Sequence, residues 1–154
     1  MTPPKSGPKR IVRTDDILVS AAAEEVFSVL ADLSSYKEWW PRSTQFQIDD
    51  TGAAKVGTRM RISNQGAVRW VAEVTAIEPN RRIAFRYGEG AWDGTAEWTL
   101  TEEAGGVRVR YAVDIVPVPF LIRLVGRFVD LGAKHSARMQ RVLERLKTRV
   151  AHPR

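Results

Sequence analysis

Three side chains of this sequence could move a proton inside an enclosed site: His135, Tyr87 and Tyr111. A histidine with its ordinary pKa of about 6.5 can act as an acid or a base near neutral pH. The two tyrosine hydroxyls could orient a ligand carbonyl group. No motif places a second titrating group beside His135, so the alternative is a structural histidine bonded to a backbone carbonyl or a tyrosine hydroxyl. These three residues are the candidates for catalysis.

Residue types that hold metals are scarce. The chain has no cysteine, and His135 and His152 have no metal-ligand spacing between them. We therefore expect neither a metal site nor a cofactor. The sequence also lacks a signal-peptide-like run and any stretch of about 18 apolar residues. Together with the absence of cysteine, this predicts a cytoplasmic protein.

Aromatic residues at alternating positions could surround a flat, apolar ligand. They recur together with the small residues Ala72, Gly94, Ala96 and Gly132, which would leave space between them. The alternative is that the same aromatic side chains fill an ordinary core. The candidates for ligand contact are Trp40, Trp70, Phe85, Tyr87, Trp92, Trp98, Tyr111, Phe128, Gly132, His135 and Met139.

The elements that must position these residues follow from hydrophobic periodicity. Residues 11–19 are typical of a strand, and a helix over about 21–32 precedes a short helix over about 34–40 that Pro41 ends. From about residue 44 to 116 the period is two, which predicts five or six antiparallel strands with one buried face. Turn residues separate these strands at 50–52, 64–66, 78–80, 88–90 and 103–106.

After Pro119 the period returns to 3.6 for about thirty residues, which predicts the longest helix of the chain. We expect its apolar face to lie against the sheet. Gly132 lies near the centre of that face, where either the sheet packs closely on the helix or space is left for a ligand. The face consists of Leu121, Phe128, Gly132, His135, Met139, Leu143, Leu146 and Val150.

Basic residues are concentrated at the two ends of the chain, whose net charge is +6. Residues 1–10 are expected to form a disordered basic arm. On the long helix the cations share one flank, which predicts either a solvated face or a surface that docks on an anionic membrane or an acidic partner. A nucleic-acid partner is not expected, because no aromatic residues are interleaved with these charges. The flank consists of Arg123, Arg127, Lys134, Arg138, Arg141, Arg145 and Arg149.

Two local patterns resemble a known superfamily. Residues 31–41, ADLSSYKEWWP, resemble the D-l-x-x-Y-x-x-W-x-P segment of bacterial polyketide cyclase-like proteins, and residues 75–83, TAIEPNRRI, resemble their strand-turn-strand element. The chain thus resembles the START-related superfamily, also called SRPBCC, which includes pollen-allergen-like carriers and lipid-transfer domains. The resemblance implies one START-like domain over residues 11–150, with a tail at 151–154.

The fold implied by this resemblance is α+β, of the helix-grip type. It is a curved antiparallel sheet of six to seven strands, with two short helices after the first strand and a long C-terminal helix over the concave face. Relatives use the hollow between sheet and helix to carry lipids, sterols or aromatic molecules, or to hold a polyketide during cyclisation. The superfamily shares no catalytic triad, so only the cavity-lining role of the inward-facing positions is carried over.

We therefore expect a carrier or sensor that binds a hydrophobic or aromatic small molecule, such as a lipid or polyketide, between the sheet and the long helix. One alternative is a cyclase or dehydratase that uses the same cavity, with His135, Tyr87 or Tyr111 moving protons. Another is a regulator that binds a partner through the basic flank. Of Trp39 and Trp40, we expect one to be a buried plug and the other to lie near the cavity entrance.

Overall fold

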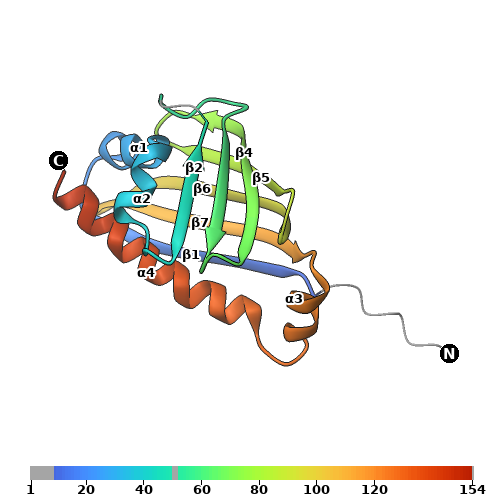
Figure 1. The fold of residues 1–154 in the computed structure, drawn as a ribbon. Helices are drawn as coiled ribbons and strands as arrows, with labels where there is room; N and C mark the ends of the chain where they lie inside the picture. Colours follow the sequence, from blue (N-terminus) through green and yellow to red (C-terminus); the bar gives the residue numbers. More distant parts are fainter. Residues whose placement is uncertain (1–8, 50–51, 154) are drawn as a thin grey trace.

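A computed structural model describes residues 9–49 and 52–153, which form a seven-stranded antiparallel sheet curled around a long helix (Figure 1). The strand order is β1-β7-β6-β5-β4-β3-β2, so the first two strands of the chain form opposite edges of the sheet. The predicted helix-grip fold is confirmed, whereas most of the arm expected at residues 1–10 lies outside the described residues. The strands are β1 (Ile11–Val19), β2 (Thr44–Ile48), β3 (Arg59–Asn64), β4 (Val68–Glu78), β5 (Arg82–Gly88), β6 (Trp92–Glu103) and β7 (Gly106–Pro117).

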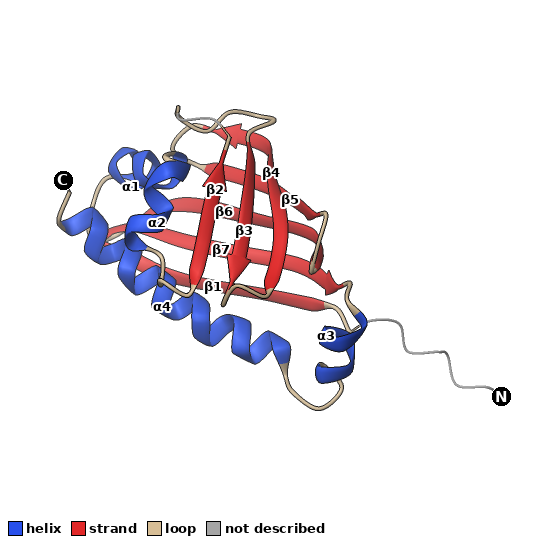
Figure 2. Cartoon of the chain, in the orientation of Figure 1, coloured by secondary structure: helices blue, strands red, loops and turns tan. Residues whose placement is uncertain are grey.

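The long helix has a pair of short helices near its C-terminal end and a third short helix near its N-terminal end (Figure 2). A pair of short helices follows β1, as expected, and the long helix α4 lies along β1 on the concave side. No helix of the described residues is long and apolar enough to cross a bilayer. The helical segments are α1 (Ala23–Ala31), the 3-10 turn η1 (Leu33–Ser35), α2 (Tyr36–Trp39), α3 (Phe120–Val125) and α4 (Leu131–Ala151).

The predicted period of two appears as alternating burial along the strands. In β6, Ala96, Trp98 and Leu100 are buried on the concave side, and the residues between them keep part of their surface exposed. The tight links fall where the sequence predicts turns, and Asn80 and Glu89 take the left-handed backbone conformation there, with φ of 62° and 54°. The sheet therefore turns one continuous set of large side chains toward α4.

Gly94 lets β6 approach β7 closely. Its φ is +145°, and a Cβ atom at this position would lie 2.0 Å from the carbonyl oxygen of Asp114. A residue with a side chain could not occupy this position without moving the backbone of β7. The glycine was expected to leave room for a ligand, but what it makes room for is the neighbouring strand.

The single long helix expected after Pro119 is interrupted. It divides into α3 and α4, because Gly126 is a poor helix former and Asp130 begins a new helix by accepting a hydrogen bond from the backbone N–H of Ala133 at 2.9 Å. Residues before and after this break therefore do not share one helical face. The prediction for Phe128 is therefore wrong: its side chain does not face the sheet and is 84% exposed.

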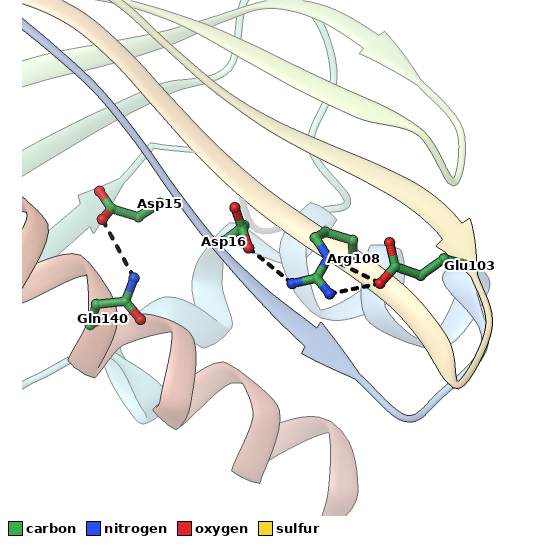
Figure 3. Close-up of polar contacts among 5 residues, drawn as sticks. All are labelled: Asp15, Asp16, Glu103, Arg108 and Gln140. Atoms are coloured by element: carbon green, nitrogen blue, oxygen red, sulfur yellow. Dashed lines mark hydrogen bonds and ion pairs between the residues drawn. The ribbon is translucent and has the colours of Figure 1, made fainter.

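Two adjacent carboxylates of β1 hold the strand to its neighbours (Figure 3). The buried Asp15 faces α4 and accepts hydrogen bonds from Ser136 Oγ at 3.1 Å and Gln140 Nε2 at 3.5 Å. Asp16 points to the other side of the strand, where Arg108 of β7 donates to it at 2.9 Å. Because successive side chains of a strand point to opposite sides, Asp15 attaches α4 to β1 and Asp16 attaches β7 to it.

Candidate ligand-binding site

A cavity of about 160 Å³ lies between the concave face of the sheet and the N-terminal half of α4. Because an apolar cavity of about 150 Å³ can hold benzene, this space suits about one aromatic ring. The lining residues are Ile11, Tyr36, Trp40, Thr44, Phe46, Met60, Ile62, Trp70, Ala72, Phe85, Tyr87, Trp92, Trp98, Tyr111, Ile115, Leu131, Lys134, His135, Arg138 and Met139.

Strand register explains why the space stays open. Ala72 of β4 lies opposite Tyr87 of β5, and Phe85 of β5 lies opposite Ala96 of β6. These two large side chains thus each have an alanine as one cross-strand neighbour on the same face. Trp70 packs obliquely against Tyr87, with ring centroids 5.9 Å apart, so aromatic faces form much of the wall.

The hydroxyls of Tyr87 and Tyr111 are hydrogen-bonded to each other in the buried wall. Burial raises the pKa of Tyr87 to about 12, although its hydrogen bond with Tyr111 opposes the change. Burial also raises the pKa of Tyr111 well above its ordinary value, and the nearby Tyr87 adds to this shift. Both tyrosines are therefore protonated at neutral pH and act as hydrogen-bonding groups.

His135 is a neutral histidine at physiological pH. Burial lowers its pKa to about 4, while the buried carboxylate of Asp15 opposes this shift and Arg138 adds to it. Its ring lies near that of Tyr111, with centroids 6.4 Å apart. A base with so low a pKa takes up a proton poorly near pH 7, so the site is suited to hydrogen bonding more than to proton transfer.

Three polar atoms in the cavity wall have no hydrogen-bond partner among the described residues. They are Thr44 Oγ1, Trp70 Nε1 and His135 Nε2, from β2, β4 and α4. Trp70 Nε1 is directed toward the hydroxyl of Tyr87, whose pKa it lowers slightly, but it does not form a hydrogen bond of ordinary geometry there. Because buried polar groups are normally paired, these atoms mark places where a ligand would complete the bonding.

Two cations of α4 also line the cavity. Lys134 is exposed at the rim, and the half-buried Arg138 lies one turn further along the helix. With the Asn64 amide oriented so that its oxygen faces Arg138, both terminal guanidinium nitrogens donate to that oxygen, at 2.6 and 2.7 Å, and the amide nitrogen donates to the backbone oxygen of Ser43. Sequence analysis assigned Arg138 to the basic flank and did not associate it with the cavity.

The structure places most of the expected ligand contacts around this cavity. Of those predicted from the sequence, Trp40, Trp70, Phe85, Tyr87, Trp92, Trp98, Tyr111, His135 and Met139 line it. Phe128 and Gly132 do not. Sequence reasoning missed Thr44 and Phe46, although they lie two residues apart in a strand and therefore share one face.

Gly132 neither packs against the sheet backbone nor borders the cavity. A Cβ atom at this position would lie 2.6 Å from Nε of Arg13, a side chain of β1. The neighbour is thus the flexible end of a charged side chain, not the sheet backbone and not the cavity. The prediction that Gly132 contributes ligand space is wrong, because the face of α4 at this level is turned toward β1.

The two adjacent tryptophans take different positions. Trp39 is fully buried and its indole N–H donates to Ser35 Oγ at 3.2 Å, so it anchors α2. Trp40 is half-buried, stacks on Tyr36 with ring centroids 5.5 Å apart, and lines the cavity. This arrangement matches the expected division into a plug and a residue close to the cavity.

The basic flank is not one continuous free surface. Arg145 donates to the backbone oxygen of Trp39 at 2.6 Å, and Arg149 bonds the Glu38 carboxylate at 2.7 Å, so both fasten α4 to α2. Arg138 belongs to the cavity. The remaining members of the flank are exposed, namely Arg123, Arg127, Lys134 and Arg141.

The side chains around the cavity are mostly apolar. The described residues contain no cluster of three or more histidine, aspartate or glutamate side chains that could hold a metal ion. The walls are apolar and aromatic, and the few polar groups are neutral except for the two cations on α4. A concave, mostly apolar space with a few convergent polar groups is the usual form of a small-molecule site.

The chain belongs to the polyketide cyclase / dehydrase and lipid transport family, whose model matches residues 10–151. This confirms the resemblance found in the two sequence patterns. A comparison with curated protein sequences found no significant match.

Several solved structures share the fold. Protein TTHA0849 from Thermus thermophilus superposes with a TM-score of 0.69 at 20% identity, covering 93% of this chain and 97% of that one. Protein CV1439 from Chromobacterium violaceum gives a TM-score of 0.67 at 16% identity, covering 90% and 96%. DynU16, from the dynemicin biosynthetic locus, gives 0.66 at 18% identity, and this chain covers 47% of it. At these identities the likeness concerns the fold alone.

Proposed function

We propose that this protein is a carrier or sensor that encloses a small hydrophobic or aromatic molecule between its sheet and α4. The observation that carries the proposal is an unfilled cavity of about 160 Å³ with aromatic walls. Protein interiors are normally close-packed, so an apolar space of this size at the centre of the fold favours a ligand. Transfer of an apolar molecule from water into it is favourable.

The burial of the three candidate proton-transfer groups supports binding over catalysis. A general acid or base works best when its pKa lies near the operating pH. The pKa of His135 is lowered to about 4, and those of Tyr87 and Tyr111 are raised far above 7, chiefly by burial in each case. None of the three is matched to proton transfer at neutral pH.

The paired hydroxyls of Tyr87 and Tyr111 favour a second candidate function, that of a cyclase or dehydratase. A ketone oxygen of a polyketide could accept a hydrogen bond from this pair as negative charge develops on it. In that case Tyr87→Phe should reduce turnover of a poly-ketone substrate by about 10² while changing its binding little. Equal losses of binding and turnover would contradict this role.

The carrier proposal is tested by titrating the protein with neutral aromatic molecules such as toluene, styrene and naphthalene. We expect binding at one site with a change in tryptophan emission, because Trp40, Trp70, Trp92 and Trp98 all line the cavity. Calorimetry supplies the stoichiometry. A protein that binds none of these molecules would contradict the proposal.

A pair of variants localises this binding. Ala72→Leu adds a branched side chain to the cavity wall and should weaken toluene binding at least tenfold. Ala112→Leu makes the same change on the opposite face of the sheet, next to Tyr111 in β7, and should leave binding unchanged. Equal effects of the two variants would place the bound molecule outside this cavity.

A further inference from the structure

The guanidinium group of Arg138 lines the cavity and, among the described residues, lacks the carboxylate partner that several other arginines of this fold have. Arg82, Arg108 and Arg149 each donate to at least one carboxylate. Arg138 is half-buried in the cavity wall, and no carboxylate of the described residues lies within ion-pair distance of it. Its acceptor is the neutral amide oxygen of Asn64. Partial removal of a cation from water without a counter-charge is unfavourable, and burial lowers the pKa of Arg138.

The hydrogen-bonding capacity of Arg138 is only partly used. A guanidinium group has five N–H donors in a planar fork, and Asn64 engages one from each terminal nitrogen. The remaining donors have no partner among the described residues. An oxyanion with two oxygen atoms is the group that matches such a fork best.

A second unpartnered group lies at the same end of the cavity. Thr44 and Asn64 are cross-strand neighbours in the pairing of β2 with β3, and directly opposed residues point to the same side of a sheet. Thr44 is only 7% exposed and lines the cavity, and its hydroxyl has no partner among the described residues. It is therefore placed beside the amide that holds Arg138. Lys134, one helical turn away, adds a second positive charge at the rim.

We infer that the cavity binds a monocyclic aromatic carboxylic acid, with the ring among the aromatic walls and the carboxylate bonded to Arg138 and the Thr44 hydroxyl. The inference rests on the proposed function and deepens it by naming the ligand class. The size of the ligand follows from the cavity volume, which suits one ring. The acid group of the ligand is inferred from Arg138, a cation without a carboxylate partner among the described residues, and from the adjacent unpaired hydroxyl of Thr44.

The test compares 3-phenylpropionate with its amide, which has almost the same shape but no charge. Wild-type protein should bind the acid at least tenfold more tightly, because hydrogen bonds to charged groups are stronger than those between neutral groups. In Arg138→Gln this preference should vanish while affinity for the amide is kept. Arg141→Gln, which removes an exposed arginine of the same helix outside the cavity, should behave as wild type.

The outcomes separate the inference from the proposed function. Equal affinity for acid and amide, or a preference for the acid that survives in Arg138→Gln, overturns the inference while the carrier function stands. Binding of toluene without binding of either phenylpropionyl compound does the same. If no aromatic molecule binds, both fail. Circular dichroism verifies that the variants fold, and Thr44→Val, which keeps the shape of the side chain, should independently weaken acid binding several-fold.

A different surface carries a second, independent inference. The segment from Val118 to Val129, which includes α3, exposes a set of large apolar side chains, hereafter the α3 patch. Phe120 and Leu121 are each 72% exposed, and monomeric proteins seldom present so many adjacent apolar residues to water. The patch consists of Val118, Phe120, Leu121, Leu124, Val125 and Phe128.

The charges within the segment from Val118 to Val129 are of one sign. Arg123 and Arg127 are exposed within the segment, and it contains no acidic residue between Val118 and Val129. A short helix with exposed aromatic and aliphatic side chains next to arginines matches the chemistry of an anionic lipid surface, where apolar groups enter the interface and cations remain at the headgroups. We infer that the α3 patch docks on an anionic membrane surface.

Vesicle sedimentation tests this docking. Wild-type protein should bind vesicles of phosphatidylglycerol and phosphatidylcholine in equal parts at low salt and should not bind phosphatidylcholine alone. The double variant Phe120→Ser/Phe128→Ser should lose at least tenfold in affinity, whereas Val56→Ser, an exposed valine on the link between β2 and β3, should not. Wild type that ignores the anionic vesicles overturns the inference. So does a concentration-dependent dimer that the double variant abolishes, because a second copy would then cover the patch.

Discussion

The two halves of α4 have opposite surroundings, although they belong to one helix and face one sheet. The C-terminal half buries Val142, Leu143 and Leu146 completely. The N-terminal half, around His135 and Arg138, faces a hollow with unpartnered polar groups in its wall. The difference teaches that this fold concentrates its packing at one end and keeps the other end available for a ligand.

The short helices cause much of this difference. Both α1 and α2 contact α4, and Arg145 binds the backbone oxygen of Trp39 in α2. The N-terminal half of α4 has no such cover from the short helices and is attached through β1, where Asp15 accepts hydrogen bonds from Ser136 and Gln140. The packed end thus gains a third layer that the open end lacks.

The largest expected effect is on packing. Leu146→Ala should lower the free energy of unfolding by about 2–5 kcal/mol, because a fully buried side chain is replaced by a void. Met139→Ala, beside the existing cavity, should cost at least ~1 kcal/mol less. Urea denaturation measures both. Equal losses would mean that the two halves of the helix are packed alike.

The next effect concerns pH. His135 has an ordinary pKa of about 6.5 when unfolded, and burial lowers it to about 4 in the folded protein. The folded state then binds fewer protons between these values, so stability is lost as pH falls from about 6.5 toward 4. In His135→Gln this loss of stability should be smaller by on the order of 2 kcal/mol. Denaturation at several pH values measures this difference. If the free energy of unfolding changed equally with pH in the variant and in wild type, the burial of His135 would be contradicted.

A smaller effect of opposite sign is expected at Thr44. Its buried hydroxyl has no partner among the described residues, so Thr44→Val should raise the free energy of unfolding of the unliganded protein by about 1 kcal/mol. Thr58 is the matched control, because it is a similarly buried residue whose hydroxyl accepts a hydrogen bond from the backbone N–H of Lys55. Thr58→Val should destabilise by a similar amount. Thermal melts that shift both variants downward would show that the Thr44 hydroxyl is satisfied.

The smallest effect is expected at Gly132. In Gly132→Ala the new methyl group would displace the end of the Arg13 side chain, which can rotate, while alanine favours the helix. The two contributions oppose each other, so stability should change by less than about 1 kcal/mol and toluene binding should not change. A large loss of stability would show that Gly132 packs against the sheet. A large loss of toluene binding would show that it borders the cavity.

Sequence patterns predicted the fold well because strand alternation is a local property. The period of two placed Trp70, Phe85 and Tyr111 on one buried face, where the structure has them. The interruption of the long helix was not predicted, because a continuous 3.6-residue pattern was followed through Gly126 and Asp130. Those two residues carried the signal, as a weak helix former and a helix cap.

The site was less predictable than the fold. Whether Trp98 fills a core or borders a space depends on distances among several strands, which no pattern in one strand encodes. Arg138 was assigned to the basic flank and not to the cavity because its position depends on Asn64, which comes from the β3–β4 hairpin. The missing partners of Thr44 and His135 likewise became visible only in three dimensions.

The pairing of β1 with β7 has a consequence for how the chain folds during synthesis. Strands β3 to β7 can join one after another through short hairpins, each as soon as it leaves the ribosome, and β2 joins β3 across a longer link. β1 is made first, but its partner comes almost last, since Ile11 lies opposite Ile115. The edge of β1 that pairs with β7 therefore stays unpaired until β7 is complete, and α4, which lies on β1, follows later still. We expect closure of β1 onto β7 to be the slow step of folding, and the nascent chain to be most prone to aggregation just before it.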